Sequence, residues 1–208
     1  MNFRAHWTPS YIIARGREML SHFLRPGRPW LTQEANSILE NLLRPGDIGV
    51  EFGSGRSTLW FAKRVAKLYS IEHDREWHAK VSAMLRAEAV LNVNYSLCAD
   101  SLTPSYGLPG YVSVLSGLPP ATVDFVLVDG LFRDVCALSA LEYLRPGGVL
   151  IVDNVNWFLP SASNSPDSVG PGESPRSDLW RKFFKDVKGW RVVWTSNGVS
   201  DTAFYFKP

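Results

Sequence analysis

The chain has 208 residues, of which 45% are hydrophobic and 20% are charged. This length and composition predict one globular domain, residues 1–208, with a core of ordinary size. With 22 basic and 20 acidic residues the net charge is only +2, which disfavours a nucleic-acid partner because polyanion-binding domains are usually strongly basic. Five arginines near the N-terminus are expected to form a solvated face: Arg4, Arg15, Arg17, Arg25 and Arg28.

Cysteine usage and hydropathy indicate the cellular setting. The only cysteines, Cys98 and Cys136, each lie inside an apolar run, which favours reduced thiols in a cytoplasmic protein over a disulfide framework. Nowhere does the chain reach the roughly 18 consecutive apolar residues of a membrane span, so we expect neither a signal peptide nor a membrane partner. A homo-oligomer is compatible with the sequence, which gives no oligomeric state.

The first 46 residues have helical patterning. Apolar residues at helical spacing predict helices over residues 10–24 and 32–43, and an Arg-Pro-Gly sequence follows each of them. Thr32 is a good N-cap for the second helix. We expect residues 1–46 to form a helical cap on a cofactor-binding core of residues 47–208.

From residue 47 onward, strand and helix patterns alternate, which predicts a doubly wound α/β fold with a mostly parallel, seven-stranded sheet. The expected strands are residues 48–52, 67–72, 93–98, 123–129 and 149–153, and the expected helices are residues 57–65, 75–91 and 133–144, with a short helix in 102–120. A helix at 178–187 and strands at 190–195 and 202–206 then predict a C-terminal antiparallel β-hairpin. Residues 160–177 contain almost nothing that could pack in a core, and we expect a mobile loop there.

Residues 50–58, Val-Glu-Phe-Gly-Ser-Gly-Arg-Ser-Thr, lie where the first strand passes into a helix. Ligands of open parallel sheets bind beyond the carboxyl ends of the strands. Glycines there permit a tight turn and close approach of the backbone to a ligand, and the following helix offers free N–H groups. We therefore expect cofactor contacts from this loop, at Glu51, Gly53, Ser54, Gly55, Ser57 and Thr58.

Acidic residues also follow the next strands. Glu72 ends the second strand, where its carboxylate could accept two hydrogen bonds from ribose hydroxyls. His73 lies directly after it, and Asp100 and Ser101 follow the third strand, where they could meet a base edge or its amine. Asp129, at the end of the fourth strand, completes the predicted cofactor site.

This arrangement resembles the class I S-adenosylmethionine-dependent methyltransferases over residues 47–154. The resemblance is carried by Glu51 before Gly53, by Glu72 and by Asp100, and the closing hairpin extends it. It implies S-adenosylmethionine as the cofactor and methyl transfer as the reaction. The competing cofactor is a nicotinamide dinucleotide, whose fingerprint needs a third glycine where Thr58 stands, and we favour the methyl donor.

The ends of the fourth and fifth strands carry Asp129, Asp153 and Asn154. Two carboxylates and an amide oxygen suit a hard divalent cation such as Mg²⁺. Here the sequence looks like the catechol O-methyltransferase-like enzymes, whose metal-binding Asp and Asp-Asn pair occupy these strand ends. The resemblance implies metal-assisted O-methylation of a small hydroxylated molecule. The alternative is that Asp153 and Asn154 hydrogen-bond their own backbone after the strand.

One departure from that resemblance concerns the general base. Those enzymes place a lysine shortly after the fourth-strand aspartate, whereas this chain has Arg133, which stays protonated and is a poor base. Asp129 is therefore the candidate catalytic residue, with a metal-bound hydroxide or a residue from another loop as alternatives. The missing lysine also permits a second function, a cofactor-binding or scaffold protein without turnover. A third, RNA methylation, has only the N-terminal arginines in its favour.

Overall fold

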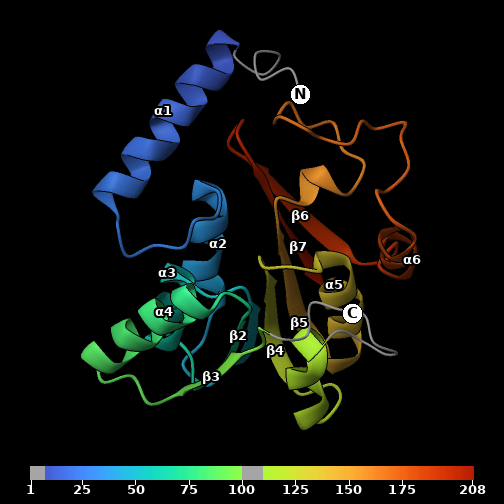
Figure 1. The fold of residues 1–208 in the computed structure, drawn as a ribbon. Helices are drawn as coiled ribbons and strands as arrows, with labels where there is room; N and C mark the ends of the chain where they lie inside the picture. Colours follow the sequence, from blue (N-terminus) through green and yellow to red (C-terminus); the bar gives the residue numbers. More distant parts are fainter. Residues whose placement is uncertain (1–7, 100–109) are drawn as a thin grey trace.

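The computed structural model describes residues 8–99 and 110–208. Two helices precede the first strand, α1 (Pro9–Leu24) and α2 (Gln33–Leu42). Both begin at a threonine N-cap, Thr8 and Thr32, whose hydroxyl accepts the backbone N–H three residues later. Helix α2 packs into the core, but α1 buries none of its residues and stands off from the body of the molecule (Figure 1). Within the described residues, no helix has the length and apolar character to cross a bilayer.

A seven-stranded sheet forms the centre of the molecule, in the order β3-β2-β1-β4-β5-β7-β6. Its strands are β1 (Ile48–Phe52), β2 (Lys67–Glu72), β3 (Val93–Leu97), β4 (Val123–Val128), β5 (Leu144–Asp153), β6 (Arg191–Ser196) and β7 (Asp201–Phe206). Strands β1 to β5 pair in parallel, and β7 is antiparallel to both β5 and β6. The predicted doubly wound sheet with a C-terminal antiparallel hairpin is confirmed.

Helices cover both faces of this sheet. The remaining ones are α3 (Arg56–Ala62), α4 (Arg75–Ala87), α5 (Arg133–Tyr143) and α6 (Asp178–Asp186), with short 3-10 helices η1 (Gly110–Gly117) and η2 (Val155–Trp157). Successive residues of β4 enter opposite cores, since Val126 and Val128 belong to one buried cluster and Phe125 and Leu127 to the other. The sheet is therefore packed on both faces, and the carboxyl ends of its parallel strands lie at one edge between the two packed layers.

Three predicted boundaries differ from the structure by three residues or more. Helices α3 and α4 end earlier than predicted, at Ala62 and Ala87, and Ala89 beyond the end of α4 has a φ of 50° that no helix accommodates. Strand β5 begins five residues earlier than predicted, because Leu144 already pairs with Val123 ahead of a register shift. Neither pairing nor positive φ can be read from apolar periodicity, which explains the errors.

Residues 160–177 contain no helix or strand, as predicted, but they are held to the body. Val169 is fully buried, and its N–H donates to Asn156 O at 2.8 Å. The hydroxyl of Ser165 donates to Asp201 Oδ1 at 2.6 Å. The expectation that almost nothing here could pack is therefore wrong for Val169 and Ser165, because their partners are distant in sequence. Mobility of the segment stays a prediction.

Candidate active site

The first wall of the candidate site is the turn after β1. Gly53 has a φ of +94°, and a Cβ on it would lie 2.6 Å from Gly130 N and 2.7 Å from Gly130 Cα. Only glycine fits this position, because the turn after β1 lies directly against the turn after β4. Gly55 differs, since a Cβ there would meet nothing closer than 3.9 Å. The fold therefore requires glycine at the first predicted position, whereas a Cβ at the second would make only ordinary contacts.

Glu72, at the end of β2, organises the second wall. Its buried carboxylate accepts hydrogen bonds from Ser54 N at 3.1 Å and Ser54 Oγ at 2.8 Å, and from the backbone N–H groups of His73 and Asp74 at 2.8 and 2.9 Å. The Nδ1 atom of His73 lies 2.9 Å from Glu72 Oε1. A ribose hydroxyl reaching this carboxylate would replace the Ser54 hydroxyl, which has Tyr95 OH 2.6 Å away as a second partner.

Glu51 lies beneath the same turn and is completely buried. Its Oε2 atom accepts hydrogen bonds from Thr58 Oγ1 and Ser70 Oγ, both at 2.6 Å. Its Oε1 atom has no hydrogen-bond partner among the residues that the structure describes. Burial raises the pKa of Glu51 to about 7, against the lowering effect of the Ser57, Ser70 and Thr58 hydroxyls. An unpaired, buried carboxylate oxygen of this kind suits a ligand that carries a cationic amine.

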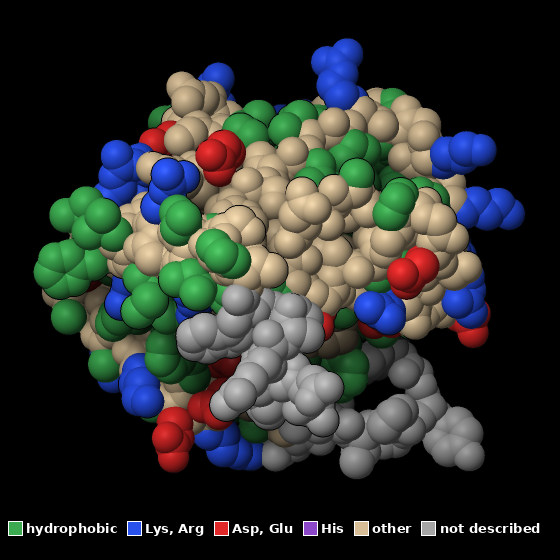
Figure 2. Space-filling model, turned by 90° about the horizontal axis from the view of Figure 1, so that it is seen from above, with side chains coloured by type: hydrophobic (Ala, Val, Ile, Leu, Met, Phe, Trp, Pro, Cys, Tyr) green, Lys and Arg blue, Asp and Glu red, His purple; other side chains and the backbone are tan. Residues whose placement is uncertain are grey.

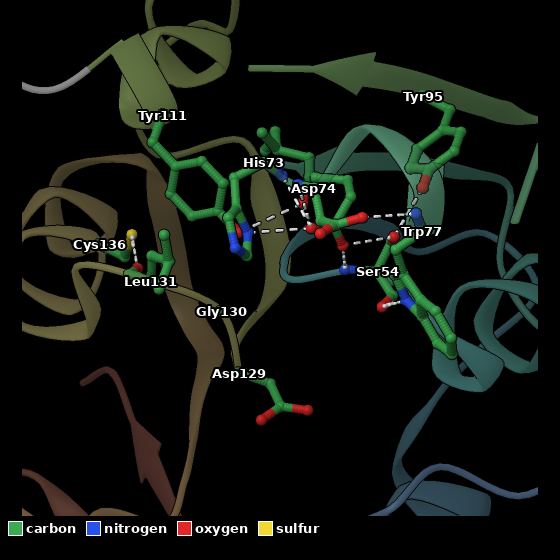
Figure 3. Close-up of polar contacts among 12 residues, drawn as sticks. Ser54, His73, Asp74, Trp77, Tyr95, Tyr111, Asp129, Gly130, Leu131 and Cys136 are labelled. Atoms are coloured by element: carbon green, nitrogen blue, oxygen red, sulfur yellow. Dashed lines mark hydrogen bonds and ion pairs between the residues drawn. The ribbon is translucent and has the colours of Figure 1, made fainter. Parts of the chain in front are cut away.

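Trp77, on the first turn of α4, is a site residue that the sequence reasoning missed. Its indole N–H donates to Ser54 O at 2.8 Å. Figure 3 shows Ser54, His73, Asp74, Trp77 and Tyr95 gathered around this contact, with Asp129 standing apart from them. The available signal was an aromatic residue in the helix turn directly after the Glu72-His73-Asp74 sequence, which sits beyond a strand end.

These residues enclose a donor-side pocket of about 450 Å³. Its lining includes Gly53, Ser54, Glu72, His73, Trp77 and Asp129. Glu51, Ser57 and Thr58 are buried behind this surface, so they would act on a ligand from beneath the turn. The predicted contacts Asp100 and Ser101 lie outside the described residues.

An acceptor-side pocket of about 490 Å³ lies on the other side of the strand ends. Its lining includes Asp129, Asp153 and Asn154 from the sheet, Trp157 from η2, and Glu18 and His22 from α1. Burial lowers the pKa of His22, with the nearby Glu18 opposing this effect, and the imidazole packs against Trp30 with ring centroids 5.3 Å apart. His22 therefore lines the pocket, a placement for which the sequence alone gave no evidence.

Asp129 is the residue that the two pockets share. Its side chain is 30% exposed and ion-paired with Arg133 at 3.0 Å. Burial, followed by the neighbouring Asp153 carboxylate, raises the pKa of Asp129 well above its ordinary value, although Arg133 opposes the shift. A carboxyl with a raised pKa at such a junction can accept a proton at a pH where an ordinary aspartate could not.

The predicted metal ligands come together, but around a guanidinium. Arg133 donates to Asp129 Oδ1 and to Asn154 Oδ1, each at 3.0 Å, and also to the backbone oxygen of Asp153. The carboxylate of Asp153 accepts from Thr202 Oγ1 at 2.7 Å. Within residues 8–99 and 110–208, no group of three or more His, Cys, Asp or Glu side chains is placed to hold a metal ion. Arg133 therefore occupies the space between Asp129 and Asn154 where a cation was expected, and Mg²⁺ binding at these residues stays a prediction.

Comparison with known proteins agrees with this geometry. The family described as a methyltransferase domain matches residues 50–155, a range that runs from the glycine turn to the first residue after Asn154. No curated protein matches the sequence.

Three solved structures illustrate the shared fold. A putative methyltransferase from Streptococcus mutans in complex with SAH is 13% identical, with a TM-score of 0.57 over 85% of this chain and 97% of that one. A SAM-dependent methyltransferase from Aquifex aeolicus is 15% identical, with a TM-score of 0.52 over 93% and 97%. An rRNA methylase from Streptococcus thermophilus is 14% identical, with a TM-score of 0.53 over 84% and 93%. With the family match and the sheet order, the chain belongs to the class I S-adenosylmethionine-dependent methyltransferase superfamily.

Proposed function

We propose that the protein transfers the methyl group of S-adenosylmethionine to the hydroxyl oxygen of a small molecule. The observation that carries this proposal is the position of Asp129, which lines both the donor-side and the acceptor-side pocket. A group at that junction touches both reactants, and methyl transfer needs mainly proximity, in-line orientation and removal of the hydroxyl proton.

Three features of the donor-side pocket and its surroundings fit the cofactor. Glu72 lines the pocket and offers its carboxylate to the ribose hydroxyls. Glu51, buried behind the lining, has an unpaired Oε1 that suits the α-amino group. Trp77 and His73 supply flat surfaces along the pocket wall. When bound, the cofactor supplies an electrophilic methyl group on a sulfonium sulfur.

On the acceptor side, Asp129 removes the proton of the acceptor hydroxyl as the new oxygen–carbon bond forms and the carbon–sulfur bond breaks. Its raised pKa makes the ionised Asp129 carboxylate a stronger base than an ordinary aspartate. His22, which lines the same pocket, is the second candidate for this proton. Arg133 orients Asp129 and Asn154 and supplies the positive charge that we had expected from Mg²⁺.

Methyl transfer from labelled S-adenosylmethionine to a panel of small hydroxylated acceptors tests the proposal. We expect the wild type to methylate at least one acceptor, with the same rate in EDTA as in Mg²⁺. The Asp129→Asn variant should bind S-adenosylhomocysteine normally but lose about 100-fold or more in rate. Tight binding of S-adenosylhomocysteine without transfer to any acceptor would instead support a cofactor-binding scaffold protein. Transfer to RNA alone, with strongly salt-dependent affinity, would support the RNA methylation alternative.

A further inference from the structure

Helix α1 carries its apolar side chains on the wrong face for a helix that packs on a core. Six of them are exposed by more than half: Ile12 (52%), Ile13 (56%), Met19 (62%), Leu20 (56%), Phe23 (81%) and Leu24 (66%). In a surface helix of a globular protein the apolar stripe normally faces the core. A 16-residue helix that buries none of its residues lacks the tertiary packing that stabilises most helices of this length.

The opposite face of α1 is the one that meets the body, although Met19 and Arg15 at one edge of the apolar side also line the acceptor-side pocket. Glu18 Oε1 accepts from Asn197 Nδ2 at 3.2 Å, and His22 packs on Trp30. Ala14 lies against the β6–β7 turn at Gly198. At 100° per residue, the six exposed apolar residues and Gly16 fill one continuous arc of roughly 140°, opposite Glu18. Figure 2 shows hydrophobic side chains gathered at the left edge, the side on which Figure 1 places α1.

The charged residues beside the apolar arc of α1 limit which kind of partner can cover it. Arg15 and Arg17 border it on its two sides, and Arg25 and Arg28 follow the helix. Glu18 is the only acidic residue of α1, and it is already paired with Arg15 and Asn197. Because Glu18 already pairs with Arg15, a second copy packed α1 against α1 would bring the two Arg17 side chains together with no further acidic residue of the helix to pair with them. An anionic surface, in contrast, complements both the arc and its arginine borders.

We propose that α1 lies flat on an anionic lipid bilayer, with the six apolar side chains in the interface and the bordering arginines on lipid phosphates. Amphipathic helices of this kind bind through buried apolar area together with electrostatic attraction to acidic lipids. The sequence-based expectation of no membrane partner considered only spanning segments, which have no bearing on a helix that lies in the interface. Because α1 also lines the acceptor-side pocket, docking places that pocket at the lipid surface.

Co-sedimentation with vesicles tests this proposal without any cofactor or acceptor. The full-length protein is mixed with vesicles of phosphatidylcholine alone, or of phosphatidylcholine with phosphatidylglycerol. We expect binding to the anionic vesicles that weakens as salt rises, and little binding to phosphatidylcholine alone. The double variant Leu20→Ser/Phe23→Ser should lose at least about tenfold in affinity. The matched control is Leu91→Ser, since Leu91 is 96% exposed but lies after α4, and it should bind as the wild type does.

Three outcomes would overturn the proposal. One is an absence of binding to anionic vesicles, and another is equal loss of binding in the double variant and in the Leu91→Ser control. The third comes from sedimentation velocity: a wild-type dimer that the double variant converts to a monomer would show that a second copy covers the arc. Thermal unfolding of each variant confirms that it is folded, because both substitutions replace exposed side chains. None of these results depends on methyl transfer.

Discussion

The two pockets that meet at Asp129 are built in different ways. The donor-side pocket is walled by the turns after β1 and β2, where Gly53 lies against Gly130 and the Glu72 carboxylate receives four hydrogen bonds. The acceptor-side pocket is completed by α1, a helix that buries none of its residues. We infer that the donor half is formed before any ligand arrives, whereas the acceptor half depends on how α1 is held.

We expect the largest loss of stability from a substitution where the turns after β1 and β4 approach each other. Gly53→Ala places a Cβ on Gly130 at a positive φ, so we expect a loss of about 2–4 kcal/mol in the free energy of unfolding. Gly55→Ala is the matched control and should change stability by less than about 1 kcal/mol, since a Cβ there would meet no atom closer than 3.9 Å. Urea unfolding of both variants measures this, and equal stabilities would show that the donor-side wall is not rigid.

The buried Glu51 makes the stability of the folded protein depend on pH. Because burial raises its pKa from 4.5 to about 7, the folded protein holds this proton more tightly than the unfolded chain does. The contribution of Glu51 to stability is therefore greatest at low pH, and it falls by about 3 kcal/mol as pH rises from below 4.5 to above 7.

The Glu51→Gln variant should lose this part of the pH dependence, as measured by urea unfolding between pH 5 and about pH 8. The slopes from Asp129 and Asp153, whose pKa values are also raised, remain in both proteins, so the difference between them isolates Glu51. The exposed Glu34→Gln serves as a control and should behave as the wild type. Parallel curves for wild type and Glu51→Gln would contradict the account of the buried carboxylate.

Cofactor affinity tests whether Glu72 belongs to the donor-side pocket. Glu72→Ala should weaken S-adenosylhomocysteine binding by roughly 1–3 kcal/mol, because charge-assisted hydrogen bonds to the ribose are lost. Isothermal titration calorimetry measures this directly. Glu88→Ala, which removes a half-exposed carboxylate paired with Lys63, should leave the affinity unchanged. If Glu72→Ala binds as tightly as the wild type, Glu72 does not belong to the cofactor site.

The smallest expected effect is weak metal binding at the acceptor-side pocket. In the wild type the Arg133 guanidinium holds the oxygens of Asp129 and Asn154, so we expect no Mn²⁺ binding by electron paramagnetic resonance. Arg133→Ala removes that cation, and the freed oxygens should then bind Mn²⁺ weakly. Adding Asp153→Asn to this variant should abolish the new site. Stoichiometric Mn²⁺ binding by the wild type would restore the metal-assisted mechanism.

Much of the fold and the donor-side residues could be predicted, because the signals are local. Apolar strands that end at Gly, Glu or Asp predicted where Gly53, Glu72 and Asp129 lie, and alternation of elements predicted the parallel sheet. What could not be predicted depends on contacts between distant segments. In the sequence, Arg133 is noticed only because it stands where a lysine base was expected. In the fold its guanidinium reaches the end of β5, twenty residues onward. The outward arc of α1 is apolar in sequence, and its exposure appears only in three dimensions.

The most direct test of the central claim is a crystal structure of the protein with S-adenosylhomocysteine. We expect the ribose hydroxyls to lie within hydrogen-bond distance of Glu72 and the amino group to lie near Glu51. The sulfur should face the acceptor-side pocket beside Asp129. A molecule bound in the acceptor-side pocket, or one whose sulfur points away from Asp129, would contradict the assignment of donor and acceptor pockets.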